Sequence, residues 1–380
     1  MSAVIETAAL RSAVRAASAV TERRSTIPIL GCVRLRMDDD RLAITATDMD
    51  IRITTRAPVQ GGGDLDVAVP AGRLSRMLAA LDTEVIVLTG KGADLEFTAG
   101  ETNGRFAGFP PEDTPIVSAD FPTARTFSMP AGDLRGILAS TLTAVSTEPG
   151  RHYLNGVYLH TRVTSDGARV LSGVATDGHK LSQQDAPLPP AASEAFPARA
   201  GAGYILPRKS AGILLRMLGP SPAGDVKVSI DPNGTNARFR LADGTDLISK
   251  FIDGAFPDYE RVVPSNFTGN AKVGRRDLLS GLRRVAAMCE GKHRHVLLRF
   301  DGTRLGVMTK GEEGGHAYTA IPTVSTSHFE IVVNAAYLRT LLAASDAEVT
   351  VISYSDHVNP LLLQGEGEMS LRQVIMPVRL

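Results

Sequence analysis

A local sequence pattern that returns along the chain constrains the fold most. The pattern Pro-Ala-Gly-x-Leu-x-x-apolar-Leu occurs at Pro70–Leu78 and again at Pro130–Leu138, each time after a short run typical of a strand. A strand-to-helix unit that recurs in this way indicates a chain built from several copies of one structural element.

Apolar residues spaced four apart indicate one helix near the start of each third of the chain, as in Leu10/Val14 and Leu278/Leu282. A second helix follows in each third. The six expected helices span residues 8–17, 71–80, 131–141, 207–218, 274–285 and 335–344. Between them, Val, Ile, Leu and Thr alternate with polar residues and with Asp-Gly or Asn-Gly turns, which is typical of antiparallel hairpins. We therefore predict an α+β fold of three similar domains, each with two helices packed on antiparallel sheets.

The length of 380 residues also favours several domains, because one core seldom serves a chain this long. Phe121-Pro122 and the segment from Phe256 to Pro264 punctuate the repeat. The expected domains are 1–124, 125–256 and 257–380. The Pro-, Ala- and Gly-rich stretch 183–203 is expected to be a long surface loop of the second domain.

Charge is balanced over the chain but uneven along it. There are 41 Lys and Arg against 41 Asp and Glu, which argues against a protein that coats DNA through bulk charge. The six helices, however, hold 13 basic and 2 acidic residues, leaving 28 and 39 elsewhere. Duplex DNA is the obvious polyanion for such a basic side, although ordinary solvated helix faces rich in Arg would give the same count. No base-reading motif is present, so contact with the DNA backbone is expected.

Catalytic patterns are missing from the sequence. Asp48 and Asp177 share an Ala-Thr-Asp context that could belong to paired acids or a metal site, but its recurrence favours a structural turn. The imidazoles of His293 and His295 are flanked by cations, which disfavour a metal ion. Signatures of serine hydrolases, phosphate-loop proteins and zinc peptidases do not occur. We expect no enzymatic activity, no metal and no cofactor; a hydrolase or transferase would need a nucleophile or metal site that the sequence does not show.

No apolar run approaches the roughly 18 residues of a membrane-spanning helix. The first twenty residues lack the basic and apolar regions of a signal peptide. A cytoplasmic protein without membrane contact is therefore expected. Cys32 and Cys289 lie in apolar contexts and are expected to be buried thiols.

Seven segments in a fixed order resemble the bacterial DNA polymerase III beta subunit, the sliding clamp, over essentially the whole chain. They are Thr26–Leu30, Thr45–Asp48, Tyr153–Gly156, Ala175–Leu181, Pro207–Lys209, Phe256–Pro264 and Met376–Leu380. Each is weak alone, but together and in order they are specific.

The resemblance implies two chains joined head to tail in a ring, with helices lining the hole and sheets outside. The implied partners are double-stranded DNA, the polymerase III alpha subunit, the clamp loader and other proteins with a clamp-binding motif. The DNA-facing residues it indicates are Arg24, Arg151, Tyr153, Arg208 and Lys209. Those indicated at the dimer interface are Phe106 and Met288, near the segment Gly311–His316.

By the same resemblance, partner proteins would insert a short peptide into an apolar pocket between the second and third domains. Carried onto this sequence, the pocket comprises Leu154, Thr176, Gly178, His179, Lys180, Leu181, Pro257, Arg261, Val262, Asn334, Tyr337, Val358, Pro360, Val374, Ile375, Met376, Pro377, Val378, Arg379 and Leu380. Apolar side chains with a few polar groups at the rim suit peptide recognition.

The chain departs from the family pattern in three places. Lys180 stands where the family usually has Arg, Ser355–Pro360 is unusual for a pocket wall, and the stretch 183–203 is long. These departures leave open a specialised second clamp, or an adaptor or decoy that keeps the pocket without encircling DNA.

Overall fold

The structure is a computed structural model that describes residues 2–22, 25–61, 64–91, 93–115, 124–196, 202–289, 294–310 and 315–378. Within these ranges the chain forms three antiparallel sheets, seven α-helices and four short 3-10 helices. The α-helices are α1 (Thr7–Ala17), α2 (Ala71–Ala80), α3 (Ala131–Thr141), α4 (Ala192–Ala195), α5 (Arg208–Leu218), α6 (Arg275–Ala286) and α7 (Ala335–Leu342). The 3-10 helices are η1 (Pro28–Gly31), η2 (Pro111–Asp113), η3 (Pro149–Leu154) and η4 (Tyr259–Val262).

Strands that are distant in the sequence become neighbours in all three sheets. From one edge to the other, the four-stranded sheet contains β1 (Ala3–Glu6), β6 (Val85–Lys91), β7 (Asp94–Ala99) and β8 (Thr102–Phe106). In the same sense, the eight-stranded sheet contains β5 (Asp66–Pro70), β2 (Cys32–Asp38), β3 (Arg41–Thr47), β4 (Ile51–Pro58), β16 (Asp246–Lys250), β15 (Asn236–Arg240), β14 (Asp225–Ile230) and β9 (Arg125–Pro130). The twelve-stranded sheet contains β13 (Gly203–Pro207), β10 (Gly156–Val163), β11 (Arg169–Thr176), β12 (Lys180–Pro187), β24 (Leu371–Ile375), β23 (Leu361–Gly365), β22 (Val349–Tyr354), β17 (Gly269–Gly274), β20 (His316–Ser325), β19 (Arg304–Lys310), β18 (His295–Phe300) and β21 (Phe329–Asn334).

The sheets divide the chain into two compact units. One unit contains Met1–Gly132, Pro190–Ala195 and Gly212–Phe251, and the other contains the remainder. The middle third is shared between them because its strands join different neighbours: β16 pairs with β4 of the first third, and β12 pairs with β24 of the last third. The domain boundaries that we expect from the sequence therefore stay a prediction.

The two joints between thirds follow one rule. In each joint, one strand begins just after an Ala-Thr-Asp turn. The N-terminal half of that strand pairs with a strand of the next third. Ile51–Thr54 of β4 pair with β16, and Lys180–Gln184 of β12 pair with β24. The repeat seen in the sequence is thus also a repeat of strand pairing.

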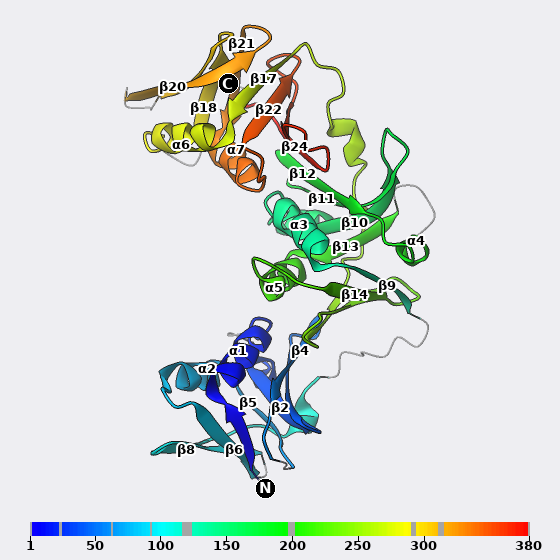
Figure 1. The fold of residues 1–380 in the computed structure, drawn as a ribbon, viewed down its shortest axis with the longest axis vertical. Helices are drawn as coiled ribbons and strands as arrows, with labels where there is room; N and C mark the ends of the chain where they lie inside the picture. Colours follow the sequence, from blue (N-terminus) through cyan, green and yellow to red (C-terminus); the bar gives the residue numbers. More distant parts are fainter. Residues whose placement is uncertain are drawn as a thin grey trace. The chain divides into compact units, whose positions relative to one another are not determined.

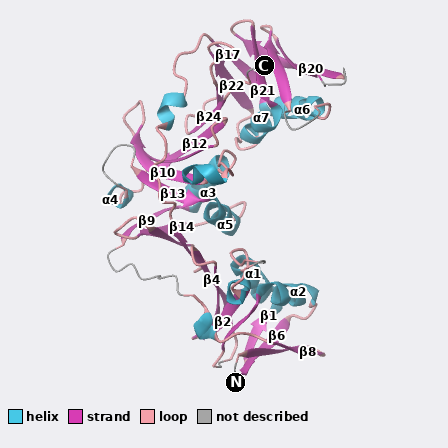
Figure 2. Cartoon of the chain, turned by 180° about the vertical axis from the view of Figure 1, so that it is seen from behind, coloured by secondary structure: helices cyan, strands magenta, loops and turns pink. Residues whose placement is uncertain are grey.

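In each of the first and last thirds, two helices lie side by side over the sheets (Figures 1 and 2). The buried stripe of α1 contains Leu10, Val14 and Ala17, at helical spacing. Arginine side chains tie each pair together. Arg11 donates to the carbonyl oxygens of Leu78 and Leu81 at 2.8 and 2.7 Å, at the end of α2.

Arg275 of α6 plays the same part for α7. Its Nη1 donates to the carbonyl oxygen of Leu342, the last residue of α7, at 3.4 Å, and its Nε donates to the carbonyl oxygen of Ala347 in the following loop at 2.6 Å. The last carbonyl groups of a helix have no partner inside the helix, so a cation satisfies both their hydrogen bonding and the helix dipole. Two of the helix-borne arginines in the sequence count therefore serve the fold.

The expected loop over 183–203 is wrong in part. Strand β12 continues to Pro187, and α4 follows with Ala192 and Ala195 buried. The sequence of Lys180–Pro187 shows no alternation of apolar and polar residues, because polar residues such as Gln183 are buried in this strand. The Gln183 side-chain amide donates to Ser172 Oγ at 3.1 Å. A polar strand of this kind has no apolar signature in the sequence.

Among the helices of the described residues, none is both long enough and apolar enough to cross a membrane.

Candidate peptide pocket and nucleic-acid interface

The turn between β11 and β12 contains four of the expected pocket residues. Asp177 Oδ1 accepts hydrogen bonds from the backbone N–H groups of His179 and Lys180, both at 2.9 Å. Thr176 Oγ1 donates to the carbonyl oxygen of Lys180 at 2.8 Å. Gly178 adopts a φ of 87°, which favours glycine. The turn is therefore rigid before any ligand arrives.

The turn after β3 is built in the same way. Asp48 Oδ1 accepts from the N–H groups of Asp50 and Ile51, at 3.1 and 2.7 Å. This repeat of side-chain contacts accounts for both Ala-Thr-Asp segments as structural turns.

Tyr337, near the start of α7, faces the turn that begins at Thr176. Its ring stacks on the His179 imidazole with centroids 5.9 Å apart, and Lys180 Nζ lies 5.2 Å from its centroid. Lys180 Nζ also forms an ion pair with Asp177 at 2.9 Å. Burial, with smaller contributions from the carboxylates of Asp177 and Glu148, raises the pKa of the Tyr337 hydroxyl. The Tyr337 ring is therefore half-buried and lies against the Lys180 ammonium group and the His179 imidazole.

The first turn of α7 is fixed by Asn334. Its side-chain oxygen accepts from the N–H groups of Ala336 and Tyr337 at 2.9 and 3.2 Å, an N-cap worth about 1 kcal/mol. The cap sets where the Tyr337 ring leaves the helix.

The end of β24 lies beside the same turn, because β24 pairs with β12. Lys180 pairs with Ile375 and Leu181 with Val374, and the N–H of Met376 donates to the carbonyl oxygen of His179 at 2.8 Å. Met376 is 37% exposed, whereas Ile375 is fully buried in the core of the last third. Among these residues, Met376 offers an apolar side chain to a ligand.

A hollow of about 390 Å³ includes Met376 in its lining. It is lined by Arg261 and Val262 of η4, by Pro360, and by the neighbouring Asn266 and Asn359. Asn266 was not singled out from the sequence, and Asn359 was included only as part of the unusual wall segment Ser355–Pro360. Val358, at 45% exposure, lies next to the hollow in sequence, and Val378 is tied to β21 by its N–H, which donates to the Val332 carbonyl oxygen at 2.8 Å.

The other expected pocket residues differ in exposure. Leu154, Leu181 and Val374 are only 4%, 1% and 2% exposed, so they lie beneath the surface of the candidate pocket. Pro257 is exposed and Pro377 half-buried. Arg379 and Leu380 lie outside the described residues.

His160 lies under the segment that carries η4. Its ring stacks on Tyr158, and its Nε2 lies 3.0 Å from the Tyr259 hydroxyl while its Nδ1 lies 3.2 Å from the Thr161 carbonyl oxygen. Both contacts are satisfied when Nδ1 donates and Nε2 accepts. Burial lowers the pKa of His160, and nearby Arg162 lowers it further.

We predict that stability depends on pH through His160. A folded-state pKa below the ordinary 6.5 favours the unfolded state as pH falls, because the unfolded chain then binds more protons. The stabilisation is complete above pH 6.5 and is lost progressively below it. Thermal unfolding from pH 8 to 5.5 should show a steeper loss for the native chain than for His160→Gln; parallel curves would contradict the role of His160.

Four of the expected DNA contacts come together. Arg151 and Tyr153 belong to η3, and Arg208 and Lys209 begin α5. The N–H of Arg208 donates to the carbonyl oxygen of Asn155 at 2.9 Å, which joins the two segments. Arg24 lies outside the described residues.

Arg151 also approaches the candidate pocket. Its guanidinium would lie 3.1 Å from a Cβ placed at Gly178, and its Nε forms an exposed ion pair with Glu148 at 3.3 Å. Tyr153 is partly buried and packs against a hydrophobic cluster that includes Tyr158 of β10.

A groove of about 740 Å³ runs along α3, α6 and α7. Arg135, Arg283 and Arg339 line it, together with Asp346 and Glu368. The sequence count of basic helices included these arginines, but only the fold shows that they share one groove.

The expected interface residues Phe106 and Met288 belong to the first and last thirds of the chain. Phe106 ends β8 and packs on Phe97 with ring centroids 5.6 Å apart. Met288 follows α6 and is 47% exposed. Of the segment Gly311–His316, residues 311–314 lie outside the described part of the chain.

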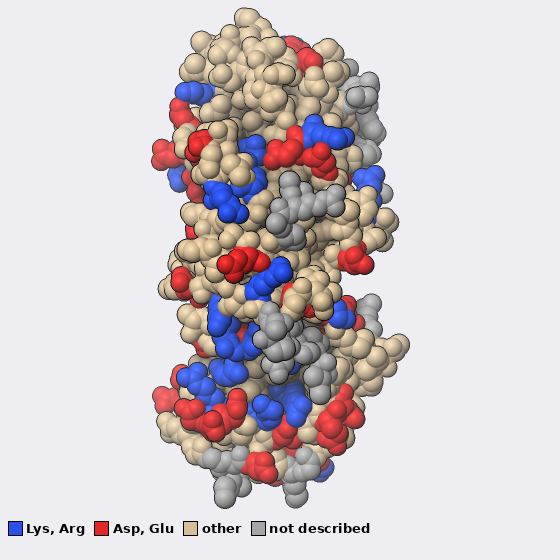
Figure 3. All heavy atoms as spheres, turned by 90° about the vertical axis from the view of Figure 1, so that its right-hand side faces the viewer, with Lys and Arg blue, Asp and Glu red and all other residues tan. Residues whose placement is uncertain are grey.

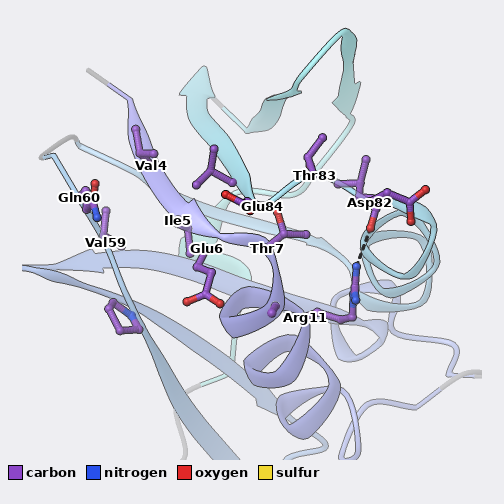
Figure 4. A pocket seen from close by; sticks show the side chains of 14 residues that line it. Val4, Ile5, Glu6, Thr7, Arg11, Val59, Gln60, Asp82, Thr83 and Glu84 are labelled. Carbon is purple, nitrogen blue, oxygen red and sulfur yellow. Dashed lines mark hydrogen bonds between the residues drawn. The ribbon is translucent and has the colours of Figure 1, made fainter.

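Another pocket, also of about 740 Å³, lies where β1 enters α1 (Figure 4). Arg11 reaches across it to the end of α2 and is held there by the carbonyl oxygen of Leu81. Arg11 is one of the basic helix residues that the sequence indicates for the DNA-facing side.

Comparison with known proteins agrees with this architecture. Three consecutive domains of the DNA polymerase III beta subunit family match the chain: the N-terminal domain at residues 1–118, the central domain at 128–258 and the C-terminal domain at 260–379. The chain belongs to the DNA polymerase III beta subunit family. The three-domain α+β fold and the resemblance seen in the sequence are thereby confirmed.

Individual members of the beta subunit family are similar over all or nearly all of their length. The beta sliding clamp of Caulobacter vibrioides is 32% identical over 100% of both chains, and that of Escherichia coli is 28% identical over 94% of both. The sliding clamp of Bartonella birtlesii, solved with griselimycin bound, is 30% identical with a TM-score of 0.91 and full coverage of both chains. That of Pseudomonas aeruginosa, also bound to griselimycin, is 26% identical with a TM-score of 0.89 and full coverage.

Proposed function

We propose that two copies of this chain close into a ring around duplex DNA and tether the replicative polymerase to it. The observation that carries the proposal is the repeated strand pairing between thirds, which leaves two complementary edges unused. Sliding clamps are processivity subunits without catalysis, and the ring holds DNA by topology. Such a protein works in the cytoplasm at the nucleoid. Our proposed domains remain 1–124, 125–256 and 257–380.

The two edges that this pairing rule leaves without a partner are those of β8 and of the N-terminal part of β20. In the described residues, β8 is the last strand of its sheet, and His316–Pro322 of β20 pair on one side only, with β19. In the last third β20 corresponds to β4 and β12, and in the first third β8 corresponds to β16 and β24. The same rule therefore pairs β8 of one copy with β20 of the other. Exposed edges of this kind otherwise favour aggregation.

The register of this joint follows from the other two. Ile248 faces Arg52 in one joint, and Val374 faces Leu181 in the other. Relative to the preceding hairpin, Arg105 of β8 occupies the position of Ile248 and Val374, and His316 of β20 occupies the position of Arg52 and Leu181. We therefore expect Arg105 of one copy to face His316 of the other. The head-to-tail pairing repeated twice gives six domains in a closed ring.

We predict that Tyr318→Asp weakens the dimer. Tyr318 lies on the unpaired part of β20 and is 60% exposed in the single chain. A buried tyrosine at an interface contributes about 2 kcal/mol or more, so the dissociation constant should rise about 30-fold. Light scattering across micromolar concentrations measures it. Met369→Asp, at a 76% exposed site outside β20, is the matched control, and equal dimer stability in both variants would contradict the joint.

The groove along α3, α6 and α7 is the proposed DNA-facing surface, together with Arg24, Arg151, Tyr153, Arg208 and Lys209. Arginines on helices meet phosphates without reading bases, as a clamp that slides requires. Acidic residues in the same groove keep the contact loose. Net neutrality is no obstacle, because closure of the ring, not affinity, retains the DNA.

Retention on DNA tests the ring directly. After loading by the clamp loader with ATP, the protein should stay on nicked circular duplex through gel filtration and leave it once the circle is cut. Protein that remains on linear DNA would contradict topological binding. Partner binding without any loading would favour the adaptor alternative.

The surface from Tyr337 to Met376 is the proposed docking pocket for the polymerase alpha subunit, the clamp loader and other proteins with a clamp-binding motif. A preformed turn, a half-buried aromatic ring and an exposed methionine beside a hollow suit a short apolar peptide. We propose that griselimycin, which is bound to the Bartonella and Pseudomonas clamps, occupies the same pocket in this chain.

A further inference from the structure

The 3-10 helix η4 places two residues at the edge of the hollow that includes Met376. Arg261 and Val262 line this hollow, and both are exposed. Tyr259, the first residue of η4, is instead only 6% exposed and packs in a cluster with Tyr158 of β10. Because Arg261 and Val262 follow Tyr259 within one helical turn, the contacts of Tyr259 decide where these two side chains lie.

The exposed contacts of η4 hold it only weakly. Arg261 pairs with Asp258 at 2.8 Å, but the two side chains are 83% and 59% exposed. Figure 3 shows acidic and basic side chains next to one another on the face that it presents, and solvent and salt weaken ion pairs of this exposed kind. Glu260, with a half-exposed side chain, lies 3.4 Å from Arg372 of β24. A buried contact is therefore needed to position η4.

His160 of β10 supplies that buried contact. Its side chain is 5% exposed, and its Nε2 lies 3.0 Å from the Tyr259 hydroxyl. Nδ1 lies 3.2 Å from the carbonyl oxygen of Thr161, which can only accept, so Nδ1 carries the proton and Nε2 accepts from Tyr259. The rings of His160 and Tyr259 also lie close, with centroids 5.6 Å apart. The neutral imidazole thus joins β10 to η4.

Charged groups act on this imidazole from three elements in the described part of the chain. Burial lowers the pKa of His160 most, and Arg162 of β10 lowers it further, whereas Asp185 of β12 and Glu260 of η4 raise it. Arg162 and Asp185 make a bidentate contact with each other, so their charges largely cancel. Strand β13 places Gly203 opposite His160, and glycine has no side chain to titrate. The imidazole is therefore neutral at pH 7.

We propose that His160 is a positioning residue for the docking pocket, and that its protonation releases η4 and weakens binding of the partner peptide. The proposal rests on the proposed function, because the peptide is expected to contact Met376 and the neighbouring η4. With the imidazole neutral, Arg261 and Val262 are held at the hollow before a peptide arrives, which lowers the ordering cost of binding.

Protonation changes which atom donates in the buried contact. A proton from solvent binds at Nε2 of His160, because Nδ1 already carries one. Nε2 then donates to the Tyr259 oxygen, and the Tyr259 hydroxyl must give its own proton to another acceptor. The neighbouring carboxylate of Glu260 can take it, since burial and then Glu260 raise the pKa of Tyr259. Turning toward Tyr259 takes Glu260 away from Arg372, so two contacts between η4 and the sheet change together.

The affinity of the full chain for griselimycin, measured by isothermal titration from pH 8 to 5.5, tests the proposal. In the native chain, affinity should be complete above pH 6.5 and fall progressively below it, because the pKa of His160 is lowered from 6.5. His160→Gln keeps an oxygen that can accept from Tyr259 but takes up no proton. Relative to its own affinity at pH 8, the variant should lose about threefold less at pH 5.5 than the native chain does. Arg169→Ala, exposed on β11, should give the native profile.

Two further measurements separate positioning from folding. In an NMR titration of the histidine rings, the pKa of His160 should be lower with griselimycin bound than without it, because a ligand that prefers the neutral form must in turn favour that form. Tyr259→Phe keeps the ring and loses the hydroxyl. It should bind griselimycin more weakly than the native chain already at pH 8 and show the flatter profile of His160→Gln. Circular dichroism at pH 5.5 checks that each chain is folded.

The possible failures are distinct. Parallel pH profiles for the native chain and His160→Gln, or a pKa of His160 that griselimycin leaves unchanged, would overturn the role of His160. Griselimycin binding at pH 8 would in that case still support the pocket. Absence of binding at every pH would overturn the pocket itself, and this proposal with it.

Discussion

Replacing Tyr337 by alanine is expected to weaken binding of griselimycin and of the polymerase alpha subunit by about 30-fold or more, as for a tyrosine at the centre of an interface. The ring is held by His179 stacking and by Lys180, 5.2 Å from its centroid. Its loss removes an apolar wall and one of the contacts of Lys180, which stays paired with Asp177. Surface plasmon resonance with immobilised clamp measures both affinities.

Tyr337→Phe is the matched control for this prediction. It keeps the ring and both of its contacts and loses only the hydroxyl, so affinity should stay within about threefold of the native value. Equal unfolding temperatures for the two variants would show that the first turn of α7 is intact. Unchanged binding by a folded Tyr337→Ala variant would contradict the position of the pocket.

The turn that carries this pocket was predictable because its chemistry is local. Thr176, Asp177 and Gly178 make their contacts within four residues of sequence, so the same letters at Thr47 and Asp48 give the same turn. Helix positions were predictable for a similar reason, since the spacing of Leu10 and Val14 already defines a buried face.

What the sequence could not reveal depends on distant partners. Arg11 belonged to the basic helix count, yet it binds carbonyl groups about 70 residues away. The extension of β12 to Pro187 depends on polar pairs such as Gln183 with Ser172, which have no apolar periodicity. Likewise, Arg52 and Arg238 line the same hollow only because of the register of β4, β16 and β15.

The joint between β12 and β24 should be sensitive to one buried ion pair. We expect Arg162→Ala to lower the free energy of unfolding by about 3–5 kcal/mol, because it leaves a buried carboxylate without its cation. Arg162 makes a bidentate contact with Asp185, and their side chains are 17% and 6% exposed. Urea unfolding followed by circular dichroism measures the change. Arg169→Ala, exposed at the start of β11, should cost less than about 0.5 kcal/mol.

The position of Asp185 gives this prediction a second readout. Its backbone N–H donates to the carbonyl oxygen of Ser370 at 2.8 Å, just before β24, so the carboxylate lies where the strands of two thirds meet. Unpairing these strands would also move Met376 away from His179 and open the pocket. Arg162→Ala should therefore lose griselimycin affinity at temperatures where α6 and α7 are still folded. Loss of binding only at global unfolding would show that the ion pair stabilises the chain as a whole and not the joint in particular.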